Sequence, residues 1–131
     1  MLMTIPHRTI RDVGGRLIME MLRSGHRAYF SDVPFAEAVE AELIVIAVMV
    51  AEMDGSPFTT ARLARDLQMP RPTLIRRISY LEKKGALTRD EQSKLRISRT
   101  MITSPSGDRS AARVRQLILD AAKALSDTRD A

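Results

Sequence analysis

The sequence has no cysteine, no tryptophan and only two histidines among its 131 residues. Without cysteine the chain cannot form disulfides, use a thiolate nucleophile, sense oxidation through a thiol or bind zinc through sulfur. Two isolated histidines, His7 and His26, are too few for a dense metal site. We therefore expect neither a metal nor another cofactor.

Aromatic residues are also scarce, at 4% of the chain, whereas methionine occurs eight times. This composition favours a helical core of aliphatic and methionine side chains over a strand-rich fold. The longest apolar run, Leu43 to Ala51, has nine residues, far fewer than the roughly 20 that a membrane-spanning helix needs. The N-terminus has no apolar signal-peptide core, because Pro6 and charged residues interrupt it. We expect a cytoplasmic protein with no membrane span.

The length fits a single domain, 1–131, that can close a hydrophobic core. Its net charge of +5 is unevenly distributed. Residues 58–101 contain eleven basic and four acidic residues, a net +7, while the rest of the chain carries ten basic and twelve acidic residues, a net −2. This asymmetry favours a dedicated anion-binding module, although charge alone does not separate it from a solvated arginine-rich surface.

Helical spacing of apolar residues predicts helices on both sides of the basic segment. We expect a first helix over about 9–23 that stops at Ser24-Gly25, and a central core helix over 34–53. Together they form an N-terminal part, 8–54, for dimerisation and core packing. Helix breakers at 104–108 precede a C-terminal helix, 106–128, whose apolar stripe and length favour a dimer contact.

The basic segment predicts a helix, a tight turn and a second helix. Thr59 or Thr60 can cap the first helix, and the turn ends at Pro70. In the second helix, Leu74, Ile78 and Leu81 form one narrow apolar stripe, which leaves a basic far face. Gly85 ends this helix, and residues 86–88 and 95–97 predict a two-stranded hairpin, or wing. The expected fold is mainly α, with a winged helix-turn-helix lobe over 57–102 between the flanking dimerisation helices.

Three motifs in this lobe resemble the multiple-antibiotic-resistance regulator (MarR) family of bacterial winged-helix transcription factors. They are Thr-x-x-x-Leu-Ala-x-x-Leu over 59–67, Arg-x-Thr-Leu over 71–74 and Leu-Glu-x-Lys-Gly over 81–85. The resemblance implies a homodimer formed by the first and last helices, with recognition helices in successive major grooves. It also places Arg71, Thr73 and Arg76 at the major groove and Lys94 at the wing tip. The chain departs from the family at Pro70, where a serine cap is usual, and at Lys94, where arginine is usual.

We therefore predict a sequence-specific regulator of transcription, a repressor, that binds a two-fold operator in double-stranded DNA through the helix near 71–84. An arginine can pair with guanine and a hydroxyl with several bases, while lysines contact phosphates. The candidate DNA-binding residues are Thr60, Arg71, Pro72, Thr73, Arg76, Arg77, Tyr80, Lys83, Lys94 and Arg96. The alternative is a winged-helix adaptor that binds protein without specific DNA binding.

An enzyme is not expected, because no nucleophile, base and orienting partner can be assembled and no phosphate-binding glycine loop is present. The glutamates between 37 and 52 suit a helix better than acid–base catalysis. A small-molecule effector of unknown identity is a further partner to consider. Four methionines could line its pocket, although core packing explains them more simply: Met19, Met21, Met49 and Met53.

Overall fold

A computed structural model describes residues 6–129, so the first five and last two residues of the predicted single domain lie outside the described part. The chain is mainly helical, as predicted, with one small antiparallel sheet. The elements are α1 (His7–Tyr29), α2 (Phe35–Met53), α3 (Thr60–Leu67), α4 (Arg71–Lys83), β1 (Leu87–Arg89), β2 (Leu95–Ile97), α5 (Arg99–Ile102) and α6 (Pro105–Arg129). None of these helices is both long and apolar enough to cross a bilayer.

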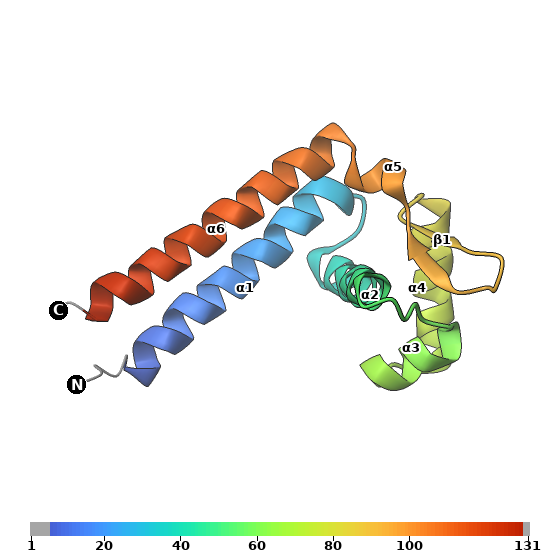
Figure 1. The fold of residues 1–131 in the computed structure, drawn as a ribbon, viewed down its shortest axis with the longest axis horizontal. Helices are drawn as coiled ribbons and strands as arrows, with labels where there is room; N and C mark the ends of the chain where they lie inside the picture. The colour runs from blue at the N-terminus through green and yellow to red at the C-terminus, as the bar shows by residue number, and fades with distance from the viewer. Residues whose placement is uncertain (1–5, 130–131) are drawn as a thin grey trace.

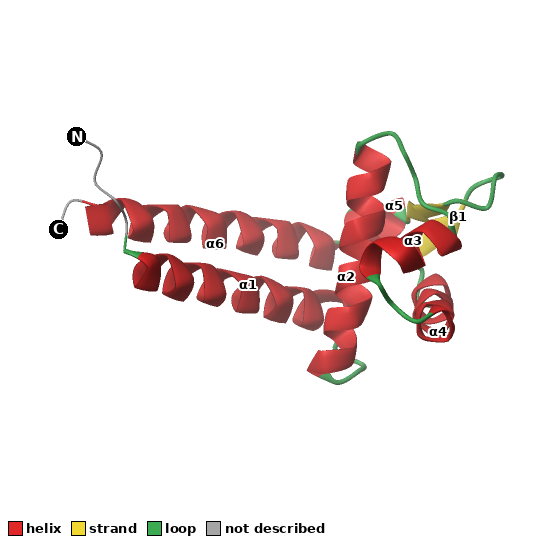
Figure 2. Ribbon diagram, turned by 90° about the horizontal axis from the view of Figure 1, so that it is seen from below, coloured by secondary structure: helices red, strands yellow, loops and turns green. Residues whose placement is uncertain are grey.

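The molecule has two parts, which Figures 1 and 2 show from two directions. The helices α1 and α6 lie antiparallel, side by side, and we call this pair the arm. With 23 and 25 residues, each arm helix is about 35 Å long. Residues 35–102, which we call the lobe, pack at one end of the arm, and α2 crosses the junction.

The hydrophobic core lies in the lobe. The predicted stripe of α4 is fully buried, since Leu74, Ile78 and Leu81 are at most 1% exposed. These side chains lie between α4 and its neighbours α2, α3 and β1. The core comprises Phe30, Ala38, Ala41, Ile44, Val48, Ala51, Phe58, Leu63, Leu74, Ile78, Leu81, Ala86, Leu87, Leu95 and Ile97.

Local sequence explains the predicted corner between α3 and α4. The Thr59 hydroxyl caps α3 by accepting a hydrogen bond from the Arg62 amide at 3.2 Å. Gln68 ends α3 in the left-handed conformation, with φ of 51°, and Pro70 precedes α4. The strands of the hairpin pair Leu87 with Ile97. Strand β1 begins one residue later than predicted, and β2 begins at the predicted residue.

The helices differ from the prediction in three respects. The first helix does not stop at Ser24-Gly25 but continues to Tyr29, because its packing against α6 stabilises the glycine-containing turn. The short helix α5 was not predicted. A helix that is apolar on every face, as α2 is over Leu43 to Ala51, should be covered all round, but its outer face leaves large side chains 38–47% exposed, namely Leu43, Ile46, Met49 and Val50.

Candidate nucleic-acid interface

The outer flank of α4 carries basic side chains that have no intramolecular partner among the described residues. Arg71, Arg76 and Lys83 are all exposed, and none forms a hydrogen bond or an ion pair with another side chain of residues 6–129. Pro72 lies on the same flank and needs no backbone donor at the second position of the helix. The flank thus presents three uncompensated positive charges to solvent.

The opposite flank of α4 faces acidic residues and is compensated. The Nε atom of Arg77 donates to Glu40 of α2 at 2.9 Å, and its Nη1 lies 3.8 Å from Glu37. The Tyr80 hydroxyl donates to Asp32 at 2.9 Å, and the Lys84 ammonium donates to the same carboxylate at 2.6 Å. These contacts tie α4 to α2 and to the loop before it.

The contacts on this flank of α4 also shift the pKa values of Asp32 and Tyr80. The hydrogen bond from Lys84 lowers the pKa of Asp32 below its ordinary value. Burial, followed by the hydrogen bond to Asp32, raises the pKa of Tyr80 to about 12. Both groups therefore keep one protonation state at neutral pH, so this flank is a fixed ion-paired contact.

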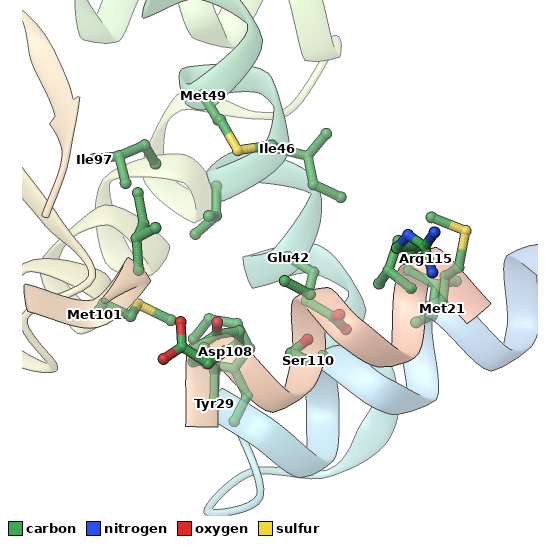
Figure 3. A pocket seen from close by; sticks show the side chains of 18 of the residues that line it. Met21, Tyr29, Glu42, Ile46, Met49, Ile97, Met101, Asp108, Ser110 and Arg115 are labelled. Atoms are coloured by element: carbon green, nitrogen blue, oxygen red, sulfur yellow. The ribbon is translucent and has the colours of Figure 1, made fainter. Parts of the chain in front are cut away.

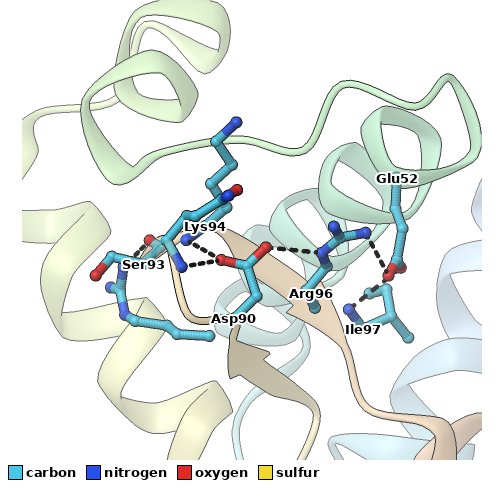
Figure 4. A network of polar contacts seen from close by, with 8 residues as sticks. Glu52, Asp90, Ser93, Lys94, Arg96 and Ile97 are labelled. Carbon is cyan, nitrogen blue, oxygen red and sulfur yellow. Dashed lines mark hydrogen bonds and ion pairs between the residues drawn. The ribbon is translucent and has the colours of Figure 1, made fainter.

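A polar network organises the hairpin (Figure 4). Asp90 accepts hydrogen bonds from the amides of Gln92 and Lys94 and from Nε of Arg96 at 3.1 Å. The bond from the Lys94 amide is the largest cause that lowers the pKa of Asp90, and Arg96 adds to it. Arg96 also lies 3.3 Å from Glu52 of α2. The network anchors the base of the hairpin to α2.

The tip of the hairpin is a three-residue loop in which Ser93 adopts the left-handed conformation at φ 61°. The side chain of Lys94 is half-buried and has no partner among the described residues. Arg89 donates to the hydroxyl of Thr60 at 3.1 Å and to the carbonyl of Ser93 at 3.2 Å. These bonds join the hairpin to the start of α3.

The ten predicted site residues thus fall into two groups within the described part of the chain. The side chains without a partner there are Arg71, Pro72, Thr73, Arg76, Lys83 and Lys94, whereas those already engaged within the chain are Thr60, Arg77, Tyr80 and Arg96. The engaged residues connect α3, α4 and the hairpin to neighbouring segments, because their polar groups are already paired within the chain.

Two further exposed residues without a side-chain partner in the described part of the chain lie outside the predicted set. Ser79 lies on α4 at about 140° from Leu74, between Ile75 and Lys83, and has no side-chain partner among the described residues. The same helical wheel could have identified it. Arg65, in the last turn of α3, is likewise exposed and without a side-chain partner in the described structure.

Within residues 6–129, no group of three or more His, Asp or Glu side chains could hold a metal ion. The chain matches no family model, and the searches of curated proteins and of solved structures found no match. We therefore infer a function from the residues and their geometry.

Proposed function

We propose that this chain is a sequence-specific double-stranded DNA-binding regulator of the winged helix-turn-helix class. In this proposal it is a MarR-like repressor that binds a two-fold operator as a homodimer in the bacterial cytoplasm. The helix α4 enters the major groove with its outer flank, and the hairpin is the wing.

The observation that carries the proposal is the electrostatic difference between the two flanks of α4. Acids on α2 and the preceding loop pair with Arg77 and Lys84, but no acid of the described chain pairs with Arg71, Arg76 or Lys83. A basic side chain whose role was to stabilise the fold would be expected to form an ion pair with an acidic side chain of the same chain. Unpaired cations on an exposed helix suit phosphates and guanine edges instead, which supply the missing negative charge from outside.

The backbone around the hairpin supports the winged-helix assignment. The Leu95 amide donates to the carbonyl of Phe58 at 2.8 Å, so the segment before α3 runs beside β2. The segment before α3 is therefore hydrogen-bonded to the hairpin at β2. This arrangement fixes the hairpin next to the helix-turn-helix, where a wing can reach the backbone beside the major groove.

The first test compares adjacent arginines on α4. Arg76→Gln removes an unpaired charge, whereas the control Arg77→Gln removes one that Glu40 already compensates. We expect Arg76→Gln to lower the affinity for the operator by about 1–3 kcal/mol per half-site and to relax the base preference at one position. Arg77→Gln should leave that preference unchanged. Equal losses of Arg76→Gln on operator and random DNA would contradict a base-reading role for Arg76.

A third variant, Lys83→Gln, tests contact with the DNA backbone, because we propose that Lys83 contacts a phosphate. Each phosphate that a side chain neutralises contributes about −0.9 to the slope of log affinity against log salt. The substitution should therefore weaken operator and random duplexes equally and make the slope shallower by about one per half-site. Fluorescence anisotropy with operator selected from random DNA measures both quantities. If the wild-type chain fails to bind any duplex at low salt, the DNA-binding proposal is wrong and the protein-binding adaptor is favoured.

The exposed apolar side chains of the arm support the proposed homodimer. Both arm helices leave large apolar side chains on the surface, although a monomer would gain by covering them. The exposed set is Ile10, Ile18, Met19, Ile118 and Leu119. A second arm packed against the first would bury part of this set and would place two α4 helices on one DNA molecule, with half-sites about 34–36 Å apart.

Two isoleucines of similar exposure test the dimer. Ile18→Lys places a charge on the arm, where the side chain is 59% exposed, and should convert the protein to a monomer. Ile75→Lys makes the same change on α4, where the side chain is 48% exposed, and should leave the dimer intact. Light scattering at micromolar concentration distinguishes these states, and a monomeric wild type would contradict the proposed dimer.

A further inference from the structure

A large pocket lies where the arm meets the lobe (Figure 3). Its volume is about 730 Å³, within the range of about 300–1,000 Å³ typical of small-molecule sites. Side chains of α1, α2 and α6 form most of its wall, and Ile97 and Met101 close the end nearest the hairpin. The lining is mainly apolar. Two of the four methionines considered from the sequence, Met21 and Met49, contribute to it.

One acidic side chain is buried in this apolar wall. Glu42 extends from α2 toward α1 and α6 and is only 7% exposed. Its Oε2 atom receives no hydrogen bond from any described residue. Burial accordingly raises the pKa of Glu42 to about 7. An unpaired buried carboxylate is costly to the fold, and a cationic group from outside the chain would remove that cost.

The neighbouring helix makes room for this carboxylate. Gly25 of α1 lies directly against Glu42, and a methyl group at Gly25 would overlap the Oε1 atom. Gly25 thus leaves free the space that the end of the Glu42 side chain occupies. A helix interior gains stability from alanine in place of glycine, so the glycine at this position serves the packing of the acidic side chain.

The other ionisable groups that line the pocket do not compensate Glu42. They are Tyr29, Asp108 and Arg115, and none of them forms a hydrogen bond or an ion pair with Glu42 in the described structure. Asp108 and Arg115 are exposed, whereas Glu42 is buried in the wall. With all carboxylates ionised, the lining carries one net negative charge.

We propose that this pocket is a binding site for a lipophilic monocation, an apolar aromatic or alkyl body with one protonated nitrogen that pairs with Glu42. The apolar wall buries the body of the ligand, and the ammonium supplies the hydrogen bonds and the charge that Oε2 lacks. This site contains none of the predicted DNA-contacting residues, although Ile118 and Leu119 of its lining also belong to the apolar set that supports the proposed dimer.

A cation fits better than the other small molecules that such a volume admits. A neutral apolar ligand would fill the space but would leave the carboxylate buried and unpaired. An anion would add a second negative charge beside Glu42 and could pair only with Arg115 at the exposed side of the pocket. The preference for a cationic ligand therefore follows from the position of Glu42 in the apolar wall of the pocket.

Three pyrene derivatives of similar size test the charge preference. They are 1-pyrenemethylamine, 1-pyrenemethanol and 1-pyrenecarboxylate, and pyrene fluorescence reports entry into an apolar site. With the full chain near pH 8, where Glu42 is ionised and the amine is protonated, we expect the amine to bind at least tenfold more tightly than the alcohol. The carboxylate should bind most weakly. Glu42→Gln should equalise amine and alcohol, whereas the control Glu20→Gln, outside the pocket, should keep the preference.

Several results would overturn the proposal. Equal affinities of the wild type for amine and alcohol would remove the role of Glu42, and tightest binding of the carboxylate would assign the site to Arg115. Loss of the preference in Asp108→Asn but not in Glu42→Gln would place the cation elsewhere. If Glu42→Gln instead changes the dimer dissociation constant and no probe binds, a second copy of the chain occupies the pocket.

Discussion

All fifteen buried apolar side chains among the described residues lie in the lobe or at Phe30 beside it, and none lies in α1 or α6. The lobe buries its apolar residues within one chain, in the manner of an independent small domain. The arm has two longer helices, yet its apolar side chains are at best half-buried. Length alone therefore does not create a core, because two helices can cover only one face of each other.

The two parts also differ in how their charges are arranged. In the lobe, ion pairs connect α4 and the hairpin to α2, so that its polar contacts join distant segments of the chain. In the arm, the ion pair of Arg16 with Asp12 lies within one helix, and among the described residues a single ion pair, that of Arg113 with Glu20 at 3.9 Å, joins α6 to α1. Because the lobe buries its apolar side chains within one chain and the arm leaves several exposed, we expect the stability of the arm, but not that of the lobe, to depend on protein concentration.

The largest expected effect is found when a leucine is replaced by alanine in the lobe and, for comparison, in the arm. Leu81→Ala empties a fully buried site in the lobe and should lower the free energy of unfolding by about 2–5 kcal/mol. Leu117→Ala removes a half-buried side chain of α6 and should cost about 1 kcal/mol or less in dilute protein. Urea unfolding monitored by circular dichroism measures both values.

The protein concentration is the control for this comparison. If the arm is completed by a second copy, the cost of Leu117→Ala should grow as the concentration rises, because the wild type then gains the dimer contact. The cost of Leu81→Ala should stay constant. Equal costs for the two variants in dilute protein would show that the arm holds a core of its own.

The lobe could be largely predicted from the sequence because its signals are local. The spacing of Leu74, Ile78 and Leu81 identified the buried face of α4, and the cap at Thr59 and the proline at position 70 marked the corner. The pairing of Arg77 with Glu40 was less accessible, because those residues are 37 positions apart. The helical wheel offers one signal, since Arg77 lies at about 300° from Leu74, near the edge of the apolar stripe.

The junction could not be predicted in the same way. Glu42 has the sequence environment of an ordinary acidic residue early in a helix, and only the approach of α1 and α6 buries it. The extension of α1 through Gly25 has the same origin, because contacts with other helices outweigh the low helix propensity of glycine. Both features are non-local, and composition and periodicity report only local structure.

A second prediction uses Glu42 to test the junction between the two parts. Its carboxyl has a pKa of about 7 in the folded protein and 4.5 ordinarily, so the folded state binds more protons between these values. The free energy of unfolding should therefore fall as the pH rises from about 4.5 to 7 and should not change further above that range. At about 1.4 kcal/mol per unit, the total loss is at most about 3 kcal/mol.

Glu42→Gln isolates this contribution because an amide does not titrate. Urea unfolding at pH 5, 6, 7 and 8 should show a decrease in the wild type that the variant lacks. Asp32 and Asp90 do not interfere, since their lowered pKa values confine their titration to more acidic solutions. Parallel pH profiles of wild type and variant would contradict the burial of an unpaired carboxyl at the junction.

The smallest expected effect tests the helices of the arm through two glycines of α1. A methyl group at Gly15 would meet no atom within 4 Å, so Gly15→Ala should raise the free energy of unfolding by about 0.5–1 kcal/mol through helix propensity alone. Gly25→Ala has the same propensity gain, but its methyl group would overlap Glu42. That variant should therefore lose about 1–3 kcal/mol, as overpacked sites do. Thermal unfolding of both variants compares them directly, and a stabilising Gly25→Ala would mean that the Glu42 side chain does not need the space left at Gly25.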